Sequence, residues 1–284
     1  MNMYIIKAIS NAVTKTGSPY VKLSLQSESE SMELNIWNCK TKFKIGDSVE
    51  LAQVKNSDGF YSTTSDNVKT YKTPKDSPLW KFIKLPISEE LWNELKSKCM
   101  SLVEDEKQKN FIKTQFDALY PLFLKGVGGK SNHHAYAGGL LNHTYEIINM
   151  YVSMYKAIPF ETNPFIVIVS ALYHDSAKTL CYRKDDFSYT ETFFLMNHVA
   201  ASSDLLGRVM TELKFEPRLI LHCQHCVLAH HELLEYGSPV KPATVEAEVL
   251  AMLDRISGHG TQIADNATVE GTQVRNLNTS CFKY

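Results

Sequence analysis

The chain has 284 residues, of which 44% are hydrophobic and 21% are charged, and its formal net charge is −1. This hydrophobic content argues against a natively disordered chain, and no apolar run approaches the roughly 20 residues that a transmembrane helix needs. Residues 1–75 carry ten Lys against seven Asp or Glu. This mildly basic start is compatible with contact to phosphates, and equally with an ordinary solvated surface.

The cysteines and the start of the chain bear on the cellular compartment. The six cysteines are scattered without the regular spacing of a disulfide framework, which is typical of a reducing environment. The first residues lack the charged-then-apolar order of a signal peptide. We therefore expect a cytoplasmic protein with no membrane partner, and the sequence leaves homo-oligomer formation open.

The first 75 residues are predicted to be strands. Turn-forming clusters at 16–19, 46–47 and 57–59 separate short segments that alternate in polarity or are rich in β-branched residues. The predicted strands cover residues 3–6, 20–25, 32–37 and 48–54. Four or five short strands over this length are typical of a small closed or nearly closed barrel. Residues 76–87, which include Pro78 and Pro86, are predicted to be a linker.

From Ser88 onward the apolar residues recur with a helical period. Ser88 followed by two glutamates and an apolar residue is a typical helix start. Helices are predicted over residues 88–103, 105–124, 134–156, 163–178, 191–212, 216–235 and 242–257. Residues 259–284 lack a clear period and are left as an unassigned C-terminal tail. The predicted fold class is therefore α+β and multidomain, a β-barrel followed by an all-α domain over residues 88–258.

Histidines and aspartates recur along successive predicted helices. They are His143, His174, Asp175, His198, His230, His231 and Asp254. Imidazole nitrogens and carboxylate oxygens suit divalent transition ions, and a carboxylate beside a histidine can bridge two of them. A single residue of this set is more often an ordinary core or surface side chain. The whole series predicts a metal site at which several helices converge.

Two further residues are candidates for contact with a substrate. Lys178 follows Asp175 by about one helical turn, so its ammonium could lie beside a phosphate held by the metal ions. The alternative is a lysine favoured by the dipole at the end of a helix. His134 precedes a Gly-Gly turn and could face the substrate or could lie on the surface of a helix.

A second group of metal-binding residue types is interpreted differently. His222, Cys223, His225 and Cys226 superficially resemble a zinc knuckle. A structural zinc ion needs four convergent ligands, whereas adjacent residues on a helix point about 100° apart. The two cysteines are therefore predicted to be core thiols.

Three phrases of the sequence carry a resemblance to a known family. They are HHAYAGGLLNHT at 133–144, His-Asp at 174–175 followed by Lys178, and HHE with a later YGSP at 230–239. They resemble the YhaM-type 3′–5′ exoribonucleases of the HD superfamily of metal-dependent phosphohydrolases. The resemblance implies an N-terminal OB-fold, an HD domain, two divalent ions, and action on single-stranded RNA and DNA. It favours Mn²⁺, with Fe, Co, Ni, Zn or Mg as alternatives.

The resemblance also implies a set of ligands. His143, His174, Asp175 and Asp254 would hold one ion, and Asp175, His198 and His230, with or without His231, would hold the second. Asp175 would be the bridging and catalytic carboxylate, assisted by Lys178 or His134 in hydrolysis of the 3′-terminal phosphodiester. Glu232 and the dipeptide 176–177 depart from the family pattern. These departures affect the expected substrate pocket and leave the ligands intact.

The barrel is predicted to bind the single strand. Such barrels pair a basic groove with aromatic side chains on which bases stack. The candidates are Trp37, Tyr61, Lys22 and Lys40, although such aromatic residues also commonly fill a barrel core.

Two other functions remain open at this point. One is an HD phosphohydrolase of free nucleotides or cyclic dinucleotides, against which the extra barrel argues. The other is a non-catalytic factor that binds single strands, against which the complete set of candidate ligands argues.

Overall fold

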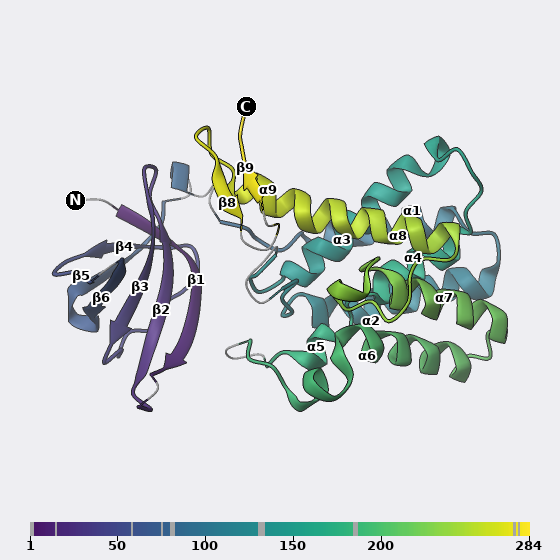
Figure 1. Cartoon of the computed structure of the whole chain (residues 1–284), viewed down its shortest axis with the longest axis horizontal. Helices are drawn as coiled ribbons and strands as arrows, with labels where there is room; N and C mark the ends of the chain where they lie inside the picture. The colour runs from purple at the N-terminus through teal and green to yellow at the C-terminus, as the bar shows by residue number, and fades with distance from the viewer. Residues whose placement is uncertain are drawn as a thin grey trace. The chain divides into compact units, whose positions relative to one another are not determined.

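The computed structural model of the chain describes residues 3–14, 16–57, 59–74, 76–79, 83–129, 134–183, 187–274, 277 and 279–284. The chain divides into two compact units, Met1–Leu85 and Pro86–Tyr284 (Figure 1). The first unit is built of strands and the second mainly of helices, so the predicted α+β class is confirmed. None of the helices in the described part of the chain has the length and apolar character needed to span a membrane.

One sheet forms the first unit. Its strands are β1 (Met3–Val13), β2 (Pro19–Gln26), β3 (Ser31–Trp37), β4 (Asp47–Leu51), β5 (Lys55–Ser57), β6 (Phe60–Thr64) and β7 (Val68–Lys72). Their order across the sheet is β5-β6-β3-β2-β1-β4-β7, and β3 and β6 run parallel while the other neighbours are antiparallel.

The two faces of β2 and β3 differ as their alternating sequence predicts. Leu23 and Leu34 are paired across the ladder and fully buried, as are Leu25 and Ile36 on the same face. Tyr20 pairs with Trp37 in the same ladder. Tyr20 is three positions from Leu23, so the side chains of this pair lie on the opposite face. The sheet thus has an apolar inner face and an outer face that carries aromatic and charged side chains.

The sheet curls back on itself without closing. Strands β6 and β7 lie at opposite sides of the sheet order, yet only the turn Ser65–Asn67 separates them along the chain. The hydroxyl of Thr63 donates to the carbonyl of Ala52 at 3.2 Å, and the amide of Ala52 donates to the carbonyl of Asn67 at 2.9 Å. Among the described residues no strand ladder joins β5 to β7, so the predicted OB-like barrel is not confirmed.

The second unit contains the helices. They are α1 (Glu89–Ser101), α2 (Glu106–Phe123), α3 (Gly139–Met154), α4 (Pro164–Tyr173), α5 (Lys178–Cys181), α6 (Glu191–Glu212), α7 (Pro217–Ala229), α8 (Val245–Arg255) and α9 (Thr261–Asn266). Several start where a side chain caps the first amides. Ser88 accepts from the amide of Leu91, and Asn163 accepts from the amide of Phe165.

Helix α4 is the centre of this unit. Every residue from Phe165 to Tyr173 is buried, and the helix packs against α2, α3, α6, α7 and α8. Phe165 stacks on Phe215 with ring centroids 5.5 Å apart. A helix buried on all sides has little freedom to shift, so the residues that follow Tyr173 are held in fixed positions.

Three predicted helices extend at least five residues beyond the observed ones at one end, for local reasons. Helix α3 starts at Gly139 because Gly138 has φ 83°, which is outside the helical region. Helix α7 ends at Ala229, shortly before Glu232 with its φ of 61°. Helix α4 ends at Tyr173, and a separate short helix α5 begins at Lys178. In each case the break lies beside a candidate site residue.

The stretch predicted as an unassigned tail contains regular structure. Helix α9 is followed by a hairpin of β8 (Thr272–Val274) and β9 (Thr279–Cys281). Elsewhere in the core, Cys223 and Cys226 are fully buried within the apolar cluster, which confirms the prediction of core thiols.

Candidate metal centre

The seven predicted ligands meet in the second unit, although they come from five separate helices. His143 lies on α3, His198 on α6 and Asp254 on α8. His174 and Asp175 directly follow the end of α4, and His230 and His231 directly follow the end of α7. Helices α4 and α7 therefore present their ligand residues at their C-terminal ends, and α4 is buried from Phe165 to Tyr173.

Helix α6 carries a break beside its site residue. Asn197 has φ 63° and ψ 156°, which interrupts the helix between its first turns and the remainder. The side-chain oxygen of Asn197 accepts from the amide of Val199 at 3.1 Å, so it caps a new helical segment that has His198 in its first turn. Such backbone is costly for a residue other than glycine, and it is typical of functional sites.

One group of ligand atoms surrounds the Oδ2 atom of Asp175. The Nε2 atoms of His143 and His174 lie 3.5 and 3.3 Å from it, and they lie 3.1 Å from each other. Oδ1 of Asp254 lies 3.0 Å from Nε2 of His143 and 3.8 Å from Nε2 of His174. Four atoms that can bind a cation therefore converge at one point.

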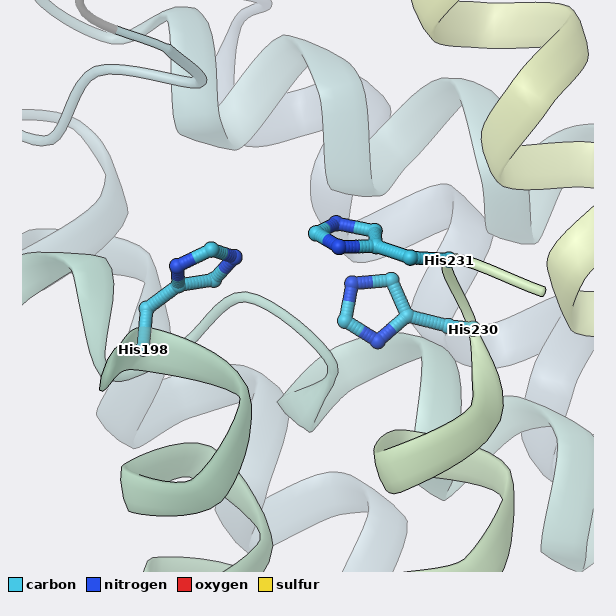
Figure 2. Close-up of side chains that lie close together, drawn as sticks. All are labelled: His198, His230 and His231. Atoms are coloured by element: carbon cyan, nitrogen blue, oxygen red, sulfur yellow. The ribbon is translucent and has the colours of Figure 1, made fainter. Parts of the chain in front are cut away.

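A second group lies on the other side of Asp175. Its Oδ1 atom is 3.5 Å from Nε2 of His198 and 3.9 Å from Nε2 of His230. Figure 2 shows His198 projecting from α6 toward the adjacent rings of His230 and His231. Ligand atoms of these three histidines lie within 4.8 Å of one another. The two oxygens of Asp175 thus face two different sets of imidazoles.

The hydrogen bonds of three rings determine which nitrogen is available. Each Nδ1 lies beside a backbone carbonyl, namely that of Ala171 for His174 (2.7 Å), Val227 for His230 (2.6 Å) and Tyr236 for His231 (2.8 Å). A carbonyl only accepts, so each Nδ1 carries a hydrogen and each neutral ring presents a lone pair at Nε2. This arrangement is typical of histidines that bind metal ions.

Several of these atoms are buried without a hydrogen-bond partner among the described residues. They are Oδ1 of Asp175, Nε2 of His230 and both ring nitrogens of His198. A buried polar atom that is not hydrogen-bonded costs about 1–3 kcal/mol. These orphaned atoms are the observation that fits a divalent cation best, because a cation would bind the lone pairs of the Asp175 oxygen, of His230 Nε2 and of one nitrogen of His198.

The protonation states agree with this arrangement. Burial lowers the pKa of His198 to about 3 and holds the pKa of His230 well below its usual value, so both rings are neutral near pH 7. Burial also opposes the charge on His174, but Asp175 and Asp254 outweigh it and raise the pKa of that ring. The two carboxylates thus favour positive charge at this end of the centre.

Lys178 lies inside the centre rather than at its rim. Its side chain is almost fully buried, and its Nζ donates to Oδ2 of Asp175 at 2.6 Å and to the carbonyl of Gly128. Burial raises the pKa of Asp175, but the Lys178 ammonium and the nearby imidazoles overcome this and hold the pKa of the carboxyl well below its usual range. Lys178 therefore fixes the orientation of Asp175 and keeps it ionised.

His134 is also buried, and its ring contacts the carboxylate of Glu146. Its Nε2 lies 3.0 Å from Oε1 of Glu146, and its ring centroid is 5.3 Å from that of His143. The neighbouring His133 lies outside the described residues. The structure thus places His134 beside a ligand rather than among the ligand atoms.

Two residues at this centre were not predicted from the sequence. Oγ of Ser257 lies 2.9 Å from Nδ1 of His143, and it donates to Oε2 of Glu146 at 2.5 Å. Glu146 follows His143 by three positions on α3, a spacing that could have identified it. Ser257 lies 114 positions from His143 in the chain, although it follows Asp254 by the same three positions.

The four residues that are predicted to contact nucleic acid lie in the first unit. The rings of Trp37 and Tyr20 are 4.9 Å apart on the outer face of the sheet. Lys22, on the same face, pairs with Glu33 at 3.0 Å. Tyr61 packs instead against the apolar cluster of this unit, and the backbone amide of Lys40 donates to Ser65.

Comparison with known proteins covers both units. Residues 140–258 match the model of the HD domain. The chain is 25% identical over 269 residues to the 3′-5′ exoribonuclease YhaM of Halalkalibacterium halodurans, an alignment that covers 89% of this chain and 81% of the relative. It is 22% identical over 265 residues to the 3′-5′ exoribonuclease YhaM of Bacillus subtilis, with 89% and 82% covered. The chain is therefore similar to YhaM-type 3′-5′ exoribonucleases along most of its length, and residues 140–258 match an HD domain.

The range that matches the HD domain includes every candidate ligand. All seven residues, from His143 to Asp254, fall inside the matched range, as do Lys178, Glu146 and Ser257. His134 falls just before it. No protein of known structure is significantly similar to the chain.

Proposed function

We propose that this chain is a metal-dependent 3′–5′ exoribonuclease that hydrolyses single-stranded RNA to nucleoside monophosphates. The observation that carries the proposal is the pair of ligand groups that share Asp175 within an HD domain. The direction of hydrolysis and the RNA substrate follow from the names of the relatives, whose alignments extend through both units.

The proposed centre holds two ions. His143, His174, Asp175 and Asp254 bind the first, and Asp175, His198, His230 and His231 bind the second. Nitrogen and oxygen ligands of this kind suit Mn²⁺, with Fe, Co, Ni, Zn or Mg as alternatives. Two such ions, when bound, activate water and neutralise the charge that develops in a displacement at phosphorus.

The residues of the chain prepare the centre for this chemistry. The carbonyl contacts of His174, His230 and His231 hold each lone pair toward the ions before they bind. Lys178 keeps Asp175 ionised and adds a positive charge beside the shared carboxylate. Such pre-oriented charges are effective because they need no reorganisation during the reaction.

We also propose that residues 1–75 form an OB-like module that holds the single strand, joined by residues 76–87 to the HD domain at 88–258. Support comes from β6 and β7, which are consecutive in the chain and belong to opposite sides of the sheet. The outer face of β2 and β3, which is the ligand-binding face of OB-folds, carries Tyr20, Lys22 and Trp37. Trp37 with Lys22 is the stronger candidate pair, because Tyr61 packs against the core.

An assay with labelled strands tests the function. Single-stranded RNA and DNA, labelled at the 5′ end, are incubated with the protein and Mn²⁺, Mg²⁺ or a chelator, and products are resolved by length. We expect a ladder that shortens stepwise from the 3′ end of RNA with Mn²⁺ and no product with the chelator. A blocked 3′ end should protect the strand, and single-strand DNA in the same assay decides whether DNA is also a substrate. Turnover of free nucleotides without shortening of RNA would contradict the proposal.

A further inference from the structure

Glu146 and Ser257 contact a proposed metal ligand from behind. We infer that these two residues are positioning residues that hold the lone pair of His143 Nε2 toward the first ion. The inference rests on the proposed function, in which His143 binds that ion. It assigns a role to two side chains that contact neither the ion nor the substrate.

The direction of each hydrogen bond follows from what each atom can do. The ionised carboxylate of Glu146 only accepts, so Ser257 donates its single hydroxyl hydrogen to Oε2 across 2.5 Å. The same oxygen then has only lone pairs to offer to Nδ1 of His143 at 2.9 Å. The ring must therefore donate from Nδ1, which leaves the lone pair of the neutral ring on Nε2.

His143 differs in this respect from three other rings of the centre. The tautomers of His174, His230 and His231 are set by backbone carbonyls, which no substitution removes. The tautomer of His143 depends instead on a serine hydroxyl whose own direction depends on a carboxylate. Without Glu146, the hydroxyl could turn and donate to Nδ1, and the hydrogen of the ring would then move to Nε2.

The positions of the residues fit this role. Ser257 lies in the π-helical turn Ile256–Gly260 directly after α8, three residues beyond the proposed ligand Asp254. Asp254 contacts Nε2 of His143 at 3.0 Å while Ser257 contacts Nδ1 of the same ring. One short segment thus places Asp254 beside the nitrogen that faces the proposed ion and Ser257 beside the other nitrogen. Such π-turns are frequent at functional sites.

His134 completes the arrangement on the far side of Glu146. Its Nε2 lies 3.0 Å from Oε1, while Ser257 occupies Oε2, so both carboxylate oxygens are held. Glu146 is therefore fixed between two side chains and cannot rotate away from Ser257 without breaking a contact. This gives His134 a structural part in positioning His143.

The test combines a spectroscopic measurement with metal affinity. Histidine ring nitrogens of the metal-free, ¹⁵N-labelled full chain report the tautomer of His143 by NMR, and calorimetry reports the affinity for Mn²⁺. The variants are Ser257→Ala, which removes the hydroxyl, and Glu146→Gln, whose amide can donate to Ser257. Asn149→Ala is the matched control. Asn149 lies on α3 and lines the same pocket as Glu146, but it takes no part in the hydrogen bonds that join Glu146, Ser257 and His143.

We expect the wild-type ring of His143 to carry its hydrogen on Nδ1. Ser257→Ala and Glu146→Gln should shift that signal and weaken Mn²⁺ binding about 10–100-fold, the usual effect of removing a partner behind a ligand. Asn149→Ala should leave both unchanged. A wild-type ring with its hydrogen on Nε2, or unchanged Mn²⁺ affinity in a folded variant, would overturn the inference.

Two further outcomes separate this inference from the proposed function. If Ser257→Ala does not fold, Glu146→Gln, which is nearly isosteric, decides the matter by the same two measurements. If the wild type binds no Mn²⁺, the proposed function fails, whereas the tautomer of His143 in the wild type and the variants still tests the positioning role.

Discussion

Metal binding should stabilise this protein in two separable steps, because Asp175 belongs to both ligand groups and Asp254 to only one. A ligand that binds only the folded state stabilises it by about 2.7 kcal/mol at 100 times its Kd. Two ions at that saturation give about 5 kcal/mol. For a unit the size of Pro86–Tyr284, each kcal/mol corresponds to about 2–4 °C in Tm, so Mn²⁺ should raise Tm by about 10–20 °C.

The substitutions follow from the contacts of each carboxylate. Asp254→Asn alters contacts to His143 and His174 alone, so the variant should keep about half of the Mn²⁺-induced shift in Tm. Asp175→Asn removes the charge shared by both groups and should abolish nearly all of the shift. The control is Asp204→Asn, since Asp204 forms an exposed pair with Arg208 on α6 and should retain the full shift.

The assay is thermal unfolding, followed by circular dichroism, of the full chain at fixed protein concentration with chelator or with Mn²⁺ over a range of concentrations. Isothermal calorimetry gives the number of ions bound by each variant. A full shift in Asp175→Asn would refute the shared carboxylate. Complete loss of the shift in Asp254→Asn would refute two separable groups.

Three further predictions concern catalysis, strand binding and the core. Asp175→Ala should abolish RNA hydrolysis yet leave strand affinity near that of the wild type in fluorescence anisotropy, and near-normal turnover would rule out the bridging role. Trp37→Ala should weaken strand binding by about 1–3 kcal/mol, the usual value of one stacked base, whereas Trp37→Phe should lose much less; equal affinity in all three proteins would exclude Trp37 from the binding face. Phe165→Ala should lower the free energy of unfolding by about 3–5 kcal/mol in denaturant titrations, because Phe165 is fully buried at the start of α4. Phe160→Ala is its control, since Phe160 is 48% exposed and should change stability little.

Much of the helical unit could be predicted because its determinants are local. The apolar run from Phe165 to Tyr173 indicated a helix, and the structure has a buried helix there, although α4 ends at Tyr173 rather than at the predicted residue 178. Alternation in β2 and β3 likewise indicated which side chains face inward. The start of α3 was predicted five residues too early although the Gly-Gly pair signals a turn. The end of α7 before Glu232 was missed, because a positive φ at a glutamate arises from packing around the loop rather than from a residue pattern.

The sequence by itself determined the kinds of ligand atoms, their order along the chain and the helices that carry them, because helix periodicity depends on neighbouring residues. Only the tertiary structure decided that the two oxygens of Asp175 face different imidazoles, that Lys178 is buried against the carbonyl of Gly128, and that Ser257 reaches His143. These contacts join residues as much as 114 positions apart. They depend on how buried helices pack against one another, and no spacing within a single helix encodes that packing.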